Sequence, residues 1–478
     1  MRNIRFLSIV ILSLCSVLAH SQTKRWTIEE TVAYALENNI QIKQTALDTD
    51  LAAIDKKGAI GNFLPTINGS ASHSWNVGLN QNITTGLLEN QTTQFTSAGV
   101  NMGVSIYSGL QNQNRLRRAK LAMLAAQYNL SKMKDDVSLM VANAYLEILF
   151  NKENLKVQKE LLANNEKQME RTDELVNAGS VARGDLMDMR ATVATSIQNV
   201  VAAENGLLIS KLSLAQLLQL EDFKDFDVAD VEADVTESTT MMQTPEAIFA
   251  KAKEERAEIK IARTNLELTE RDVKIAQGGL QPSLVGFYSF STRAAYSDRV
   301  VGFTPDIQNP TTVVGVVDGT GQNVLQPNFL PLLGKAAPLF DQFDDNKGHS
   351  FGLQISIPVL NGFSARNAVE RTRVTLERNK IAYSQAELDL ERNVYQAFTD
   401  ARGALNAYES ALAAVAARQE AFNYASEKYA VGMMNAFDFN QAQTLYANAQ
   451  SEVIRAKYEY IFRVKVVEFY FGIPIIQN

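Results

Sequence analysis

The stretch Val176-Asn-Ala-Gly-Ser-Val-Ala-Arg-Gly-Asp-Leu186 recurs, in altered form, as Tyr429-Ala-Val-Gly-Met-Met-Asn-Ala-Phe-Asp-Phe439. Each copy has glycine as its fourth residue and aspartate as its tenth. The two glycines are 253 residues apart, and at this offset residues 109–220 align without a gap on residues 362–473. The chain therefore contains two copies of one sequence pattern, which predicts an internal two-fold repeat in the fold.

The segments before these turns also match, at a second offset of 217 that places Pro65 on Pro282. Each copy then reads in the same order: helix, strands, long helix, glycine turn, long helix. We predict a first repeat over residues 22–220 and a second over residues 245–478. Between them, residues 221–244 are acidic, lack helical periodicity and are expected to form a linker that contains a short strand.

The first 21 residues have the features of a secretory signal peptide. Arg2 and Arg5 form a charged start, residues 6–18 are apolar, and Ala19-His20-Ser21 offers small residues at a cleavage site. The only cysteine, Cys15, lies inside this signal. A lipid anchor on Cys15 is disfavoured because Leu14 before it is not small. The mature chain then has no thiol for a disulfide, for catalysis or for a metal.

Charge and hydropathy narrow the possible partners. The 478 residues carry a net charge of −7, and removal of two arginines with the signal makes it −9. An acidic chain lacks the basic footprint that nucleic acid requires, so no nucleic-acid partner is expected. No mature segment approaches the roughly 18 consecutive apolar residues of a membrane-spanning helix. A membrane-inserted part would therefore have to consist of strands.

Proline-free segments on both sides of each glycine turn predict long helices over residues 112–176, 185–220, 364–429 and 438–471. The longest would extend for about 100 Å at 1.5 Å per residue. Shorter helices are expected from Thr27, which forms a capping box with Glu30, and over about 42–60. Apolar residues spaced three and four apart predict packing between helices rather than a cofactor site.

Four segments change to a period of two, which predicts strands with one apolar and one polar face. They cover about 66–79, 95–107, 283–296 and 350–359. Each is about as long as a tilted strand that crosses a bilayer. The connection at 80–94 is modest and that at 297–348 is long, and such unequal loops suit an outer-membrane barrel.

Four strands cannot close into a barrel. Open sheet edges are not tolerated in lipid, because each unpaired backbone group costs several kcal/mol there. The chain is therefore expected to pool its strands with copies of itself. Two copies would give eight strands and three would give twelve, and strand counting does not choose between them.

The doubled turns, with Ala35-Leu-Glu-Asn-Asn39 and the tail Tyr470-Phe-Gly-Ile-Pro474, resemble the TolC-like outer-membrane efflux proteins. The similarity covers essentially the whole mature chain. It implies a mainly α fold with a transmembrane β-barrel portion, in which a homotrimer shares one twelve-stranded barrel. Twelve helices would form a long periplasmic tunnel below the outer membrane of a Gram-negative cell, so outer-membrane lipid is an expected partner.

The resemblance also implies that the turns are periplasmic tips that meet a periplasmic adaptor. The adaptor would join the chain to an inner-membrane pump of the RND or ABC type. The turn residues that the resemblance assigns to adaptor docking are Gly179, Ser180, Val181, Gly432, Met433 and Asn435.

A gate at the tunnel mouth is implied in the same way. Asp438 matches a position that often forms an acidic constriction ring, and Tyr429 and Asp185 match a pair that holds the closed state. Met434 stands where the best-known member has an arginine, and Gln441 where it has another ring aspartate. We therefore expect a weaker charge lock. An alternative for both aspartates is ordinary N-capping of the helix that follows each turn.

The sequence indicates no enzyme, cofactor or metal. His73 and His349 are the only mature histidines, and neither has a second ligand at metal-binding spacing. Asp318-Gly-Thr-Gly321 lacks the strand and helix context of a catalytic or phosphate-binding loop. The acidic loop 341–346 has enough oxygens for weak calcium binding, although a solvated loop explains it better.

The resemblance, supported by the doubled turns and the four amphipathic strands, implies a passive exit duct of a tripartite efflux pump for small molecules such as drugs, toxic compounds or metal ions. A type I protein-secretion duct would have the same architecture. A non-conducting helical envelope protein would explain the long helices but not the alternation in the strands.

Overall fold

The computed structural model describes residues 25–81, 86–221, 226–230 and 239–473. The predicted signal peptide and part of the predicted linker lie outside the described residues. The chain divides into two compact units. The helical unit comprises Met1–Asp55, Ala119–Glu270 and Val374–Asn478, and the sheet unit comprises Lys56–Arg118 and Arg271–Arg373.

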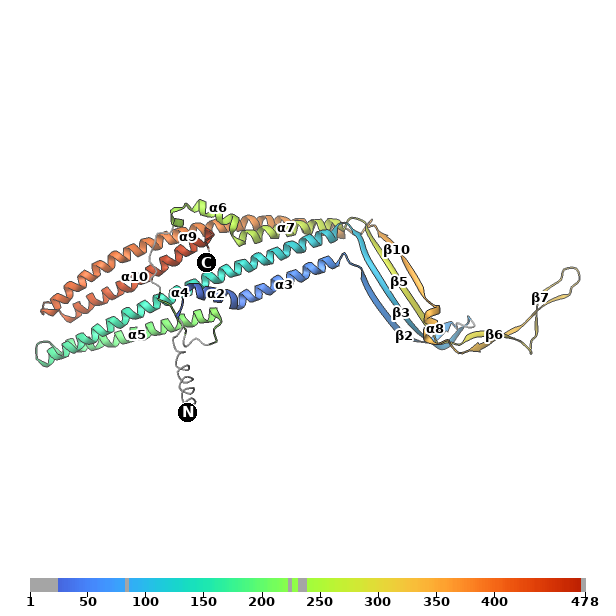
Figure 1. Cartoon of the computed structure of the whole chain (residues 1–478), viewed down its shortest axis with the longest axis horizontal. Coiled ribbons are helices and arrows are strands. Elements are labelled where there is room, and N and C mark those ends of the chain that lie inside the picture. Colours follow the sequence, from blue (N-terminus) through green and yellow to red (C-terminus); the bar gives the residue numbers. More distant parts are fainter. Residues whose placement is uncertain (1–24, 82–85, 222–225, 231–238, 474–478) are drawn as a thin grey trace, which may run out of the picture. The chain divides into compact units, whose positions relative to one another are not determined.

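Long helices dominate the structure, as Figure 1 shows, and the mainly α fold class with a two-fold repeat is confirmed. In each repeat, a helix of 67 residues is followed by one of about half that length, which lies beside it. The helices are α2 (Ile28–Asn38), α3 (Ile40–Gly61), α4 (Gln111–Asn177), α5 (Arg183–Leu218), α6 (Pro245–Glu255), α7 (Ala257–Gly278), α8 (Leu339–Asp345), α9 (Ser364–Ala430) and α10 (Ala436–Tyr470), with a 3₁₀ turn at Thr239–Met242. The capping box of Thr27 and Glu30 forms as predicted.

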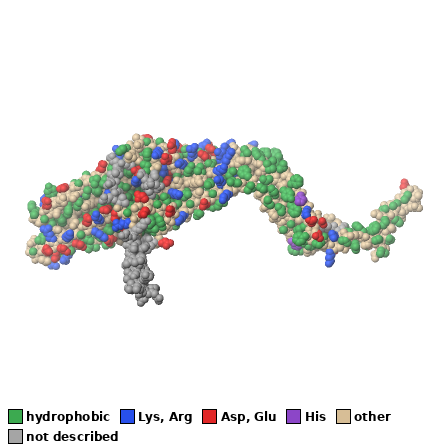
Figure 2. Space-filling view, viewed as in Figure 1, with side chains coloured by type: hydrophobic (Ala, Val, Ile, Leu, Met, Phe, Trp, Pro, Cys, Tyr) green, Lys and Arg blue, Asp and Glu red, His purple; other side chains and the backbone are tan. Residues whose placement is uncertain are grey.

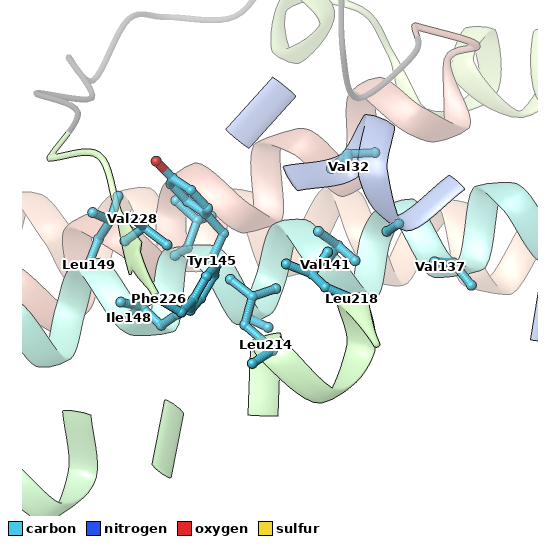
Figure 3. Packing of buried hydrophobic residues seen from close by; sticks show 14 of the residues in the cluster. Val32, Val137, Val141, Tyr145, Ile148, Leu149, Leu214, Leu218, Phe226 and Val228 are labelled. Atoms are coloured by element: carbon cyan, nitrogen blue, oxygen red, sulfur yellow. The ribbon is translucent and has the colours of Figure 1, made fainter. Parts of the chain in front are cut away.

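The main core of the helical unit lies where α4 and α5 meet a pair of two-residue strands (Figure 3). Tyr145 and Ile148 of α4 are fully buried against Leu214 and Leu218 of α5. Val228 joins them from β4 (Asp227–Val228), which pairs in parallel with β1 (Arg25–Trp26). The linker region is therefore packed onto the first repeat through β4.

A second core repeats this arrangement in the other half of the helical unit. Val394 of α9 is buried with Ile248 of α6 and Val467 of α10. Val394 is the counterpart of Val141, which is equally buried in the first core. The repeat in the sequence thus corresponds to a repeat in packing.

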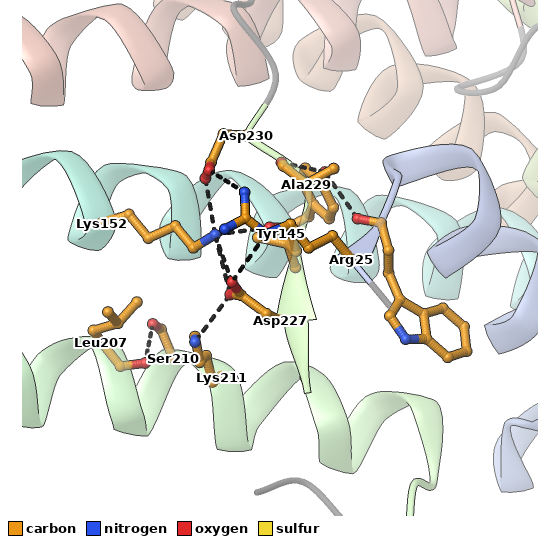
Figure 4. A network of polar contacts seen from close by, with 11 residues as sticks. Arg25, Tyr145, Lys152, Leu207, Ser210, Lys211, Asp227, Ala229 and Asp230 are labelled. Atoms are coloured by element: carbon orange, nitrogen blue, oxygen red, sulfur yellow. Dashed lines mark hydrogen bonds and ion pairs between the residues drawn. The ribbon is translucent and has the colours of Figure 1, made fainter. Parts of the chain in front are cut away.

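Polar contacts hold the linker strand to the same helices (Figure 4). Lys152 Nζ of α4 lies 3.0 Å from Asp227 Oδ1 and 2.8 Å from Asp230 Oδ1. Lys211 Nζ of α5 lies 2.9 Å from Asp227 Oδ1. The Tyr145 hydroxyl donates a hydrogen bond of 2.9 Å to the carbonyl oxygen of Ala229. Burial alone would raise the pKa of Asp227, but the two lysine ammonium groups outweigh burial and lower it.

The sheet unit contains one four-stranded antiparallel sheet in the order β10-β5-β3-β2. Its strands are β2 (Thr66–Gln81), β3 (Leu88–Ser108), β5 (Ser283–Ala295) and β10 (Gly348–Ser356). All four predicted strands are present, and β3 starts seven residues earlier than expected. The edge strands are β2 and β10, one from each repeat.

Register separates the two faces of this sheet. One row across the four strands reads Ile67, Met102, Tyr288 and Phe351, and the next row reads Asn68, Asn101, Ser289 and Ser350. On the polar face, Ser289 Oγ lies 2.7 Å from Asn101 Oδ1. The apolar face is exposed, and hydrophobic side chains cover the strands in Figure 2.

The segment 297–348 is more ordered than the expected long loop. It contains two antiparallel ribbons, which pair β6 (Arg299–Pro305) with β9 (Phe329–Gly334) and β7 (Thr311–Val316) with β8 (Asn323–Pro327), followed by the short helix α8. β6 and β9 were not predicted because both faces of their ribbon are apolar, so the sequence does not alternate there.

The chain changes from strand to helix through a strained turn that occurs once in each repeat. Gly109 and Gly362 have φ of 62° and 59°, and the residues after them, Leu110 and Phe363, also have positive φ. At Gly109 a Cβ atom would lie 2.2 Å from the carbonyl oxygen of Gly278. Only glycine allows the start of α4 and the end of α7 to approach so closely.

None of the helices in the described ranges combines the length and the apolar character that a membrane-spanning helix requires.

Candidate functional site: the two helical tips

Both tips of the helical unit end in the same backbone motif. Gly179 and Gly432 adopt φ of 70° and 73°, a left-handed conformation that suits glycine. In the first tip, the Ser180 N–H donates to Leu175 O at 2.9 Å and the Gly179 N–H donates to Val176 O at 3.0 Å. This is a Schellman motif, which satisfies carbonyl groups at the end of α4.

The second tip repeats these two hydrogen bonds residue for residue. The Met433 N–H donates to Lys428 O at 2.8 Å, and the Gly432 N–H donates to Tyr429 O at 3.1 Å. Every donor and acceptor lies 253 residues after its counterpart. The doubled stretch that decides the fold therefore encodes one helix-ending turn used twice.

The two aspartates are not N-caps, which corrects that alternative. α5 starts at Arg183 after Ala182, and α10 starts at Ala436 after Asn435, so Asp185 and Asp438 are each the third residue of a helix. The true cap of α10 is Asn435, whose Oδ1 accepts the Asp438 N–H at 2.8 Å. Both carboxylates still lie in a first turn, where the helix dipole favours negative charge.

Tyr429 packs behind the second turn in an aromatic cluster. Its ring stacks on Phe439 of α10 with centroids 4.7 Å apart. Phe422 contacts Phe439 and stacks on Tyr446 at 5.6 Å. This cluster ties the end of α9 to the start of α10.

The expected pair of Tyr429 with Asp185 is not formed among the described residues. The Tyr429 hydroxyl instead lies 3.5 Å from Thr172 Oγ1 of α4. Beside it, Arg171 donates a hydrogen bond of 3.4 Å to the carbonyl oxygen of Ala430. These two long contacts connect the first hairpin, formed by α4 and α5, to the second tip. Neither Arg171 nor Thr172 was predicted from the sequence.

A groove of about 540 Å³, lined by both polar and apolar side chains, runs between α4, α5 and α10 next to the tips. Gln441, one of the predicted gate residues, lines it together with Asp188 and Phe437. Four buried side-chain atoms of this region have no hydrogen-bond partner among the described residues: Asn165 Oδ1, Gln168 Nε2, Asn440 Oδ1 and Gln443 Oε1. The hairpins are therefore joined by amides that are only partly satisfied, which is a weak form of packing.

The second tip exposes apolar side chains that the first does not match. Met433 is 76% exposed and Phe437 is 71% exposed, whereas Met434 is half-buried. In the first turn the counterparts of Met433 and Phe437 are Ser180 and Gly184. Phe437 was not among the predicted docking residues, although a phenylalanine at the start of a helix after a glycine turn is a signal that could have found it.

The described residues contain no group of three or more histidine, cysteine, aspartate or glutamate side chains that could hold a metal ion. His73 lies on the sheet, where its Nδ1 is 2.7 Å from Thr96 Oγ1, and His349 Nδ1 is 2.9 Å from the Tyr288 hydroxyl. Both histidines are engaged with neighbouring hydroxyl groups.

One four-stranded sheet with strands from both repeats, together with two long helical hairpins (α4–α5 and α9–α10), is typical of outer-membrane efflux channels. The family model for the outer membrane efflux protein matches residues 32–219 and 248–464, and the chain belongs to this family. Its members are passive channels and not enzymes. The two matched regions correspond to the two repeats of the fold.

Two relatives are similar to this chain over most of their length. The chain is 22% identical over 449 residues to the outer membrane protein TolC of Vibrio cholerae. The aligned region covers 91% of this chain and 88% of that protein. It is also 22% identical to TolC of Escherichia coli over 433 residues, or 89% of this chain and 78% of that protein.

Among solved structures, the CmeC outer membrane channel of Campylobacter jejuni has a TM-score of 0.74 at 18% identity, and covers 93% of this chain and 85% of that one. VceC of Vibrio cholerae has a TM-score of 0.72 at 14% identity, with 93% and 96% covered. These structural likenesses concern the fold.

Proposed function

We propose that the chain is the outer-membrane exit duct of a tripartite efflux pump, which conducts small molecules passively out of the periplasm. As a homotrimer it would complete a twelve-stranded barrel, because β2 and β10 are open edges that copies of the chain can pair. The long helical hairpins would then extend into the periplasm and end at the two tips.

The tip geometry is the observation that carries this proposal. The two tips share one backbone turn, and the second presents an exposed apolar surface, with Met433 and Phe437, beside a groove whose amides are partly unsatisfied. An apolar patch next to unpaired polar groups is a surface prepared for a protein partner. We assign this partner as a periplasmic adaptor, which would connect the duct to an inner-membrane pump.

The same tips would form the gate. Thr172 and Arg171 hold the second tip through contacts of 3.5 and 3.4 Å, which are long for hydrogen bonds and therefore weak. Three copies of Asp438 around an axis would form an acidic constriction that attracts cations. Because Met434 stands in place of a charged lock residue, little free energy would hold the tip closed. Adaptor binding could then open it easily.

Single-channel recording of the purified protein in planar bilayers tests the gate. The wild type should show a small conductance that rises several-fold in Tyr429→Ala, because the stack on Phe439 and the contact with Thr172 are both lost. Tyr424→Ala removes an exposed tyrosine of the same helix and serves as the matched control, with wild-type conductance expected. Asp438→Ala should lower the preference for cations.

The absence of any conductance in the wild type and in Tyr429→Ala would overturn the duct. Capture in living cells tests the partner separately, with photo-crosslinking residues placed at Met433 and Asn435. An adaptor caught at these positions supports docking at the second tip, whereas crosslinks to the barrel or to lipid alone would overturn it.

A further inference from the structure

Basic residues gather in the sheet unit where the helices meet the strands. Figure 2 shows Lys and Arg side chains grouped over the helix ends next to the strands. The four helix ends of this unit, residues 56–65, 109–118, 271–282 and 357–373, contain ten basic and two acidic residues. They hold an excess of eight positive charges in a chain whose net charge is −7. We call these four segments the basic belt.

The belt follows directly on a band without charge. Residues 66–81, 94–108, 283–292 and 348–356 of the four strands include no lysine, arginine, aspartate or glutamate. Exposed apolar residues mark the junction between this band and the belt: Leu64, Leu110, Leu280 and Leu360. The basic residues begin within about two helical turns of the strands. Uncharged strands, apolar turns and then cations follow the order in which a bilayer leaflet passes from hydrocarbon to headgroups.

Two positions of the belt carry a cation in both repeats. Lys57 of α3 matches Lys274 of α7 at the offset of 217, and Arg118 of α4 matches Arg371 of α9 at the offset of 253. Each of the four helices therefore contributes, so that the charge surrounds the end of the sheet rather than forming one spot.

Internal acids neutralise little of this charge. Asp272 pairs with Arg118 at 2.6 Å, and Glu370 pairs with Arg373 at 2.8 Å, which uses both acids of the belt. Like charges within the belt repel each other and destabilise the compact state unless anions approach them. Lys57, Arg117, Lys274 and Arg366 are all exposed and can reach such anions.

We propose that the basic belt binds the anionic phospholipid headgroups of the membrane leaflet on the helical side of the sheet. This inference rests on the proposed membrane-inserted barrel, because the belt adjoins the apolar strand faces that lipid would cover. Each Lys or Arg near a membrane surface contributes favourable binding free energy with anionic lipid. The long side chains can also extend from an apolar stem to the phosphates.

Lipid retention measured by native mass spectrometry on the full-length protein in mild detergent tests the belt. Phosphatidylglycerol and phosphatidylcholine are the anionic and zwitterionic probes, added in equal amounts. The wild type should retain the anionic lipid preferentially, and less so as salt is raised. The variant Lys57→Gln, Arg117→Gln, Lys274→Gln and Arg366→Gln removes one exposed cation from each helix, and its preference should fall about tenfold.

A matched control removes four exposed cations of the helical unit, at Lys156, Lys167, Arg183 and Arg418. This Lys/Arg→Gln variant has the same net charge as the belt variant and should retain the wild-type preference. If the fourfold belt variant does not fold, the doubles Lys57→Gln with Arg117→Gln and Lys274→Gln with Arg366→Gln should each show part of the fall.

An unchanged preference in the belt variants, or an equal fall in the control, overturns the proposal. So does a belt variant that alters the ion selectivity of the channel while it retains the anionic lipid, because the cations then line the lumen. Because the readout is lipid retention, this proposal and the proposed duct can fail separately. If the wild type conducts no ions but the belt variant still loses the preference for anionic lipid, the duct is overturned and lipid binding by the belt stands.

Discussion

The middle of the helical unit and its tips are built from the same helices, yet they are held together in different ways. At the middle, Tyr145 is only 1% exposed, and Asp227 lies between two lysines. At the tips, buried amides such as Gln443 Oε1 lack partners among the described residues, and apolar side chains are exposed. Segments with few satisfied contacts open at lower free energy, so we expect the tips to move while the middle stays closed.

The largest effect should come from truncating the centre of the middle core. Tyr145→Ala removes a fully buried ring between α4, α5 and β4 and should lower the free energy of unfolding by about 4 kcal/mol. Thermal unfolding of the helices, followed by circular dichroism at 222 nm, measures the effect.

Tyr145→Phe refines the same measurement. It keeps the ring but removes the hydroxyl that donates to Ala229 O and Trp26 O, so about 1 kcal/mol of destabilisation is expected. An equally small loss in Tyr145→Ala would show that the middle is no more tightly packed than the tips, and the comparison would fail.

Asp227→Asn should have an intermediate effect that depends on pH. The pKa of Asp227 is lowered in the folded protein, so its carboxylate stabilises the fold above the ordinary carboxyl pKa of about 4 and loses this contribution as the pH falls through the folded value. At pH 7 the variant should be less stable than the wild type by about 2 kcal/mol. The difference should shrink below pH 4.

Asp230→Asn is the matched control, because this carboxylate is 60% exposed in the same network and should contribute less than about 1 kcal/mol. A constant difference between Asp227→Asn and the wild type from pH 7 to pH 3 would mean that the carboxylate charge does not hold the linker strand.

The architecture could be predicted from the sequence because its signals are local. A glycine in a left-handed turn and alternation of period two depend on the residues themselves, so both tips and the four strands of the sheet were found. The ribbons within 297–348 were missed because their strands have five to seven residues and the β6–β9 ribbon is apolar on both faces.

The contacts of the candidate site depend on tertiary structure and could not be predicted in the same way. The family resemblance predicts that Tyr429 is a gate residue, but the approach of its hydroxyl to Thr172 depends on how α4 packs against α9. The helix starts were predicted two residues late because each aspartate resembled a cap, whereas Asn435 caps α10 and Ala182 precedes α5 without a side-chain cap. Neither error changed the predicted fold.

The smallest effect is a gain in stability rather than a loss. It is expected at the seam of buried amides near the tips, which we define as Asn165, Gln168, Asn440 and Gln443. Gln443 is 5% exposed and its Oε1 is buried without a partner, so Gln443→Leu removes an unsatisfied polar group at similar volume. Such a replacement is nearly neutral or stabilising, and we expect a gain below about 1 kcal/mol, read as slower hydrogen exchange at the start of α10. The exposed neighbour Gln441 gives the control, because Gln441→Leu should leave exchange unchanged. A stabilised tip should also open less often in single-channel records. If Gln443→Leu instead accelerates exchange, the amide is satisfied in the assembled protein, and the seam is as firmly joined as the middle.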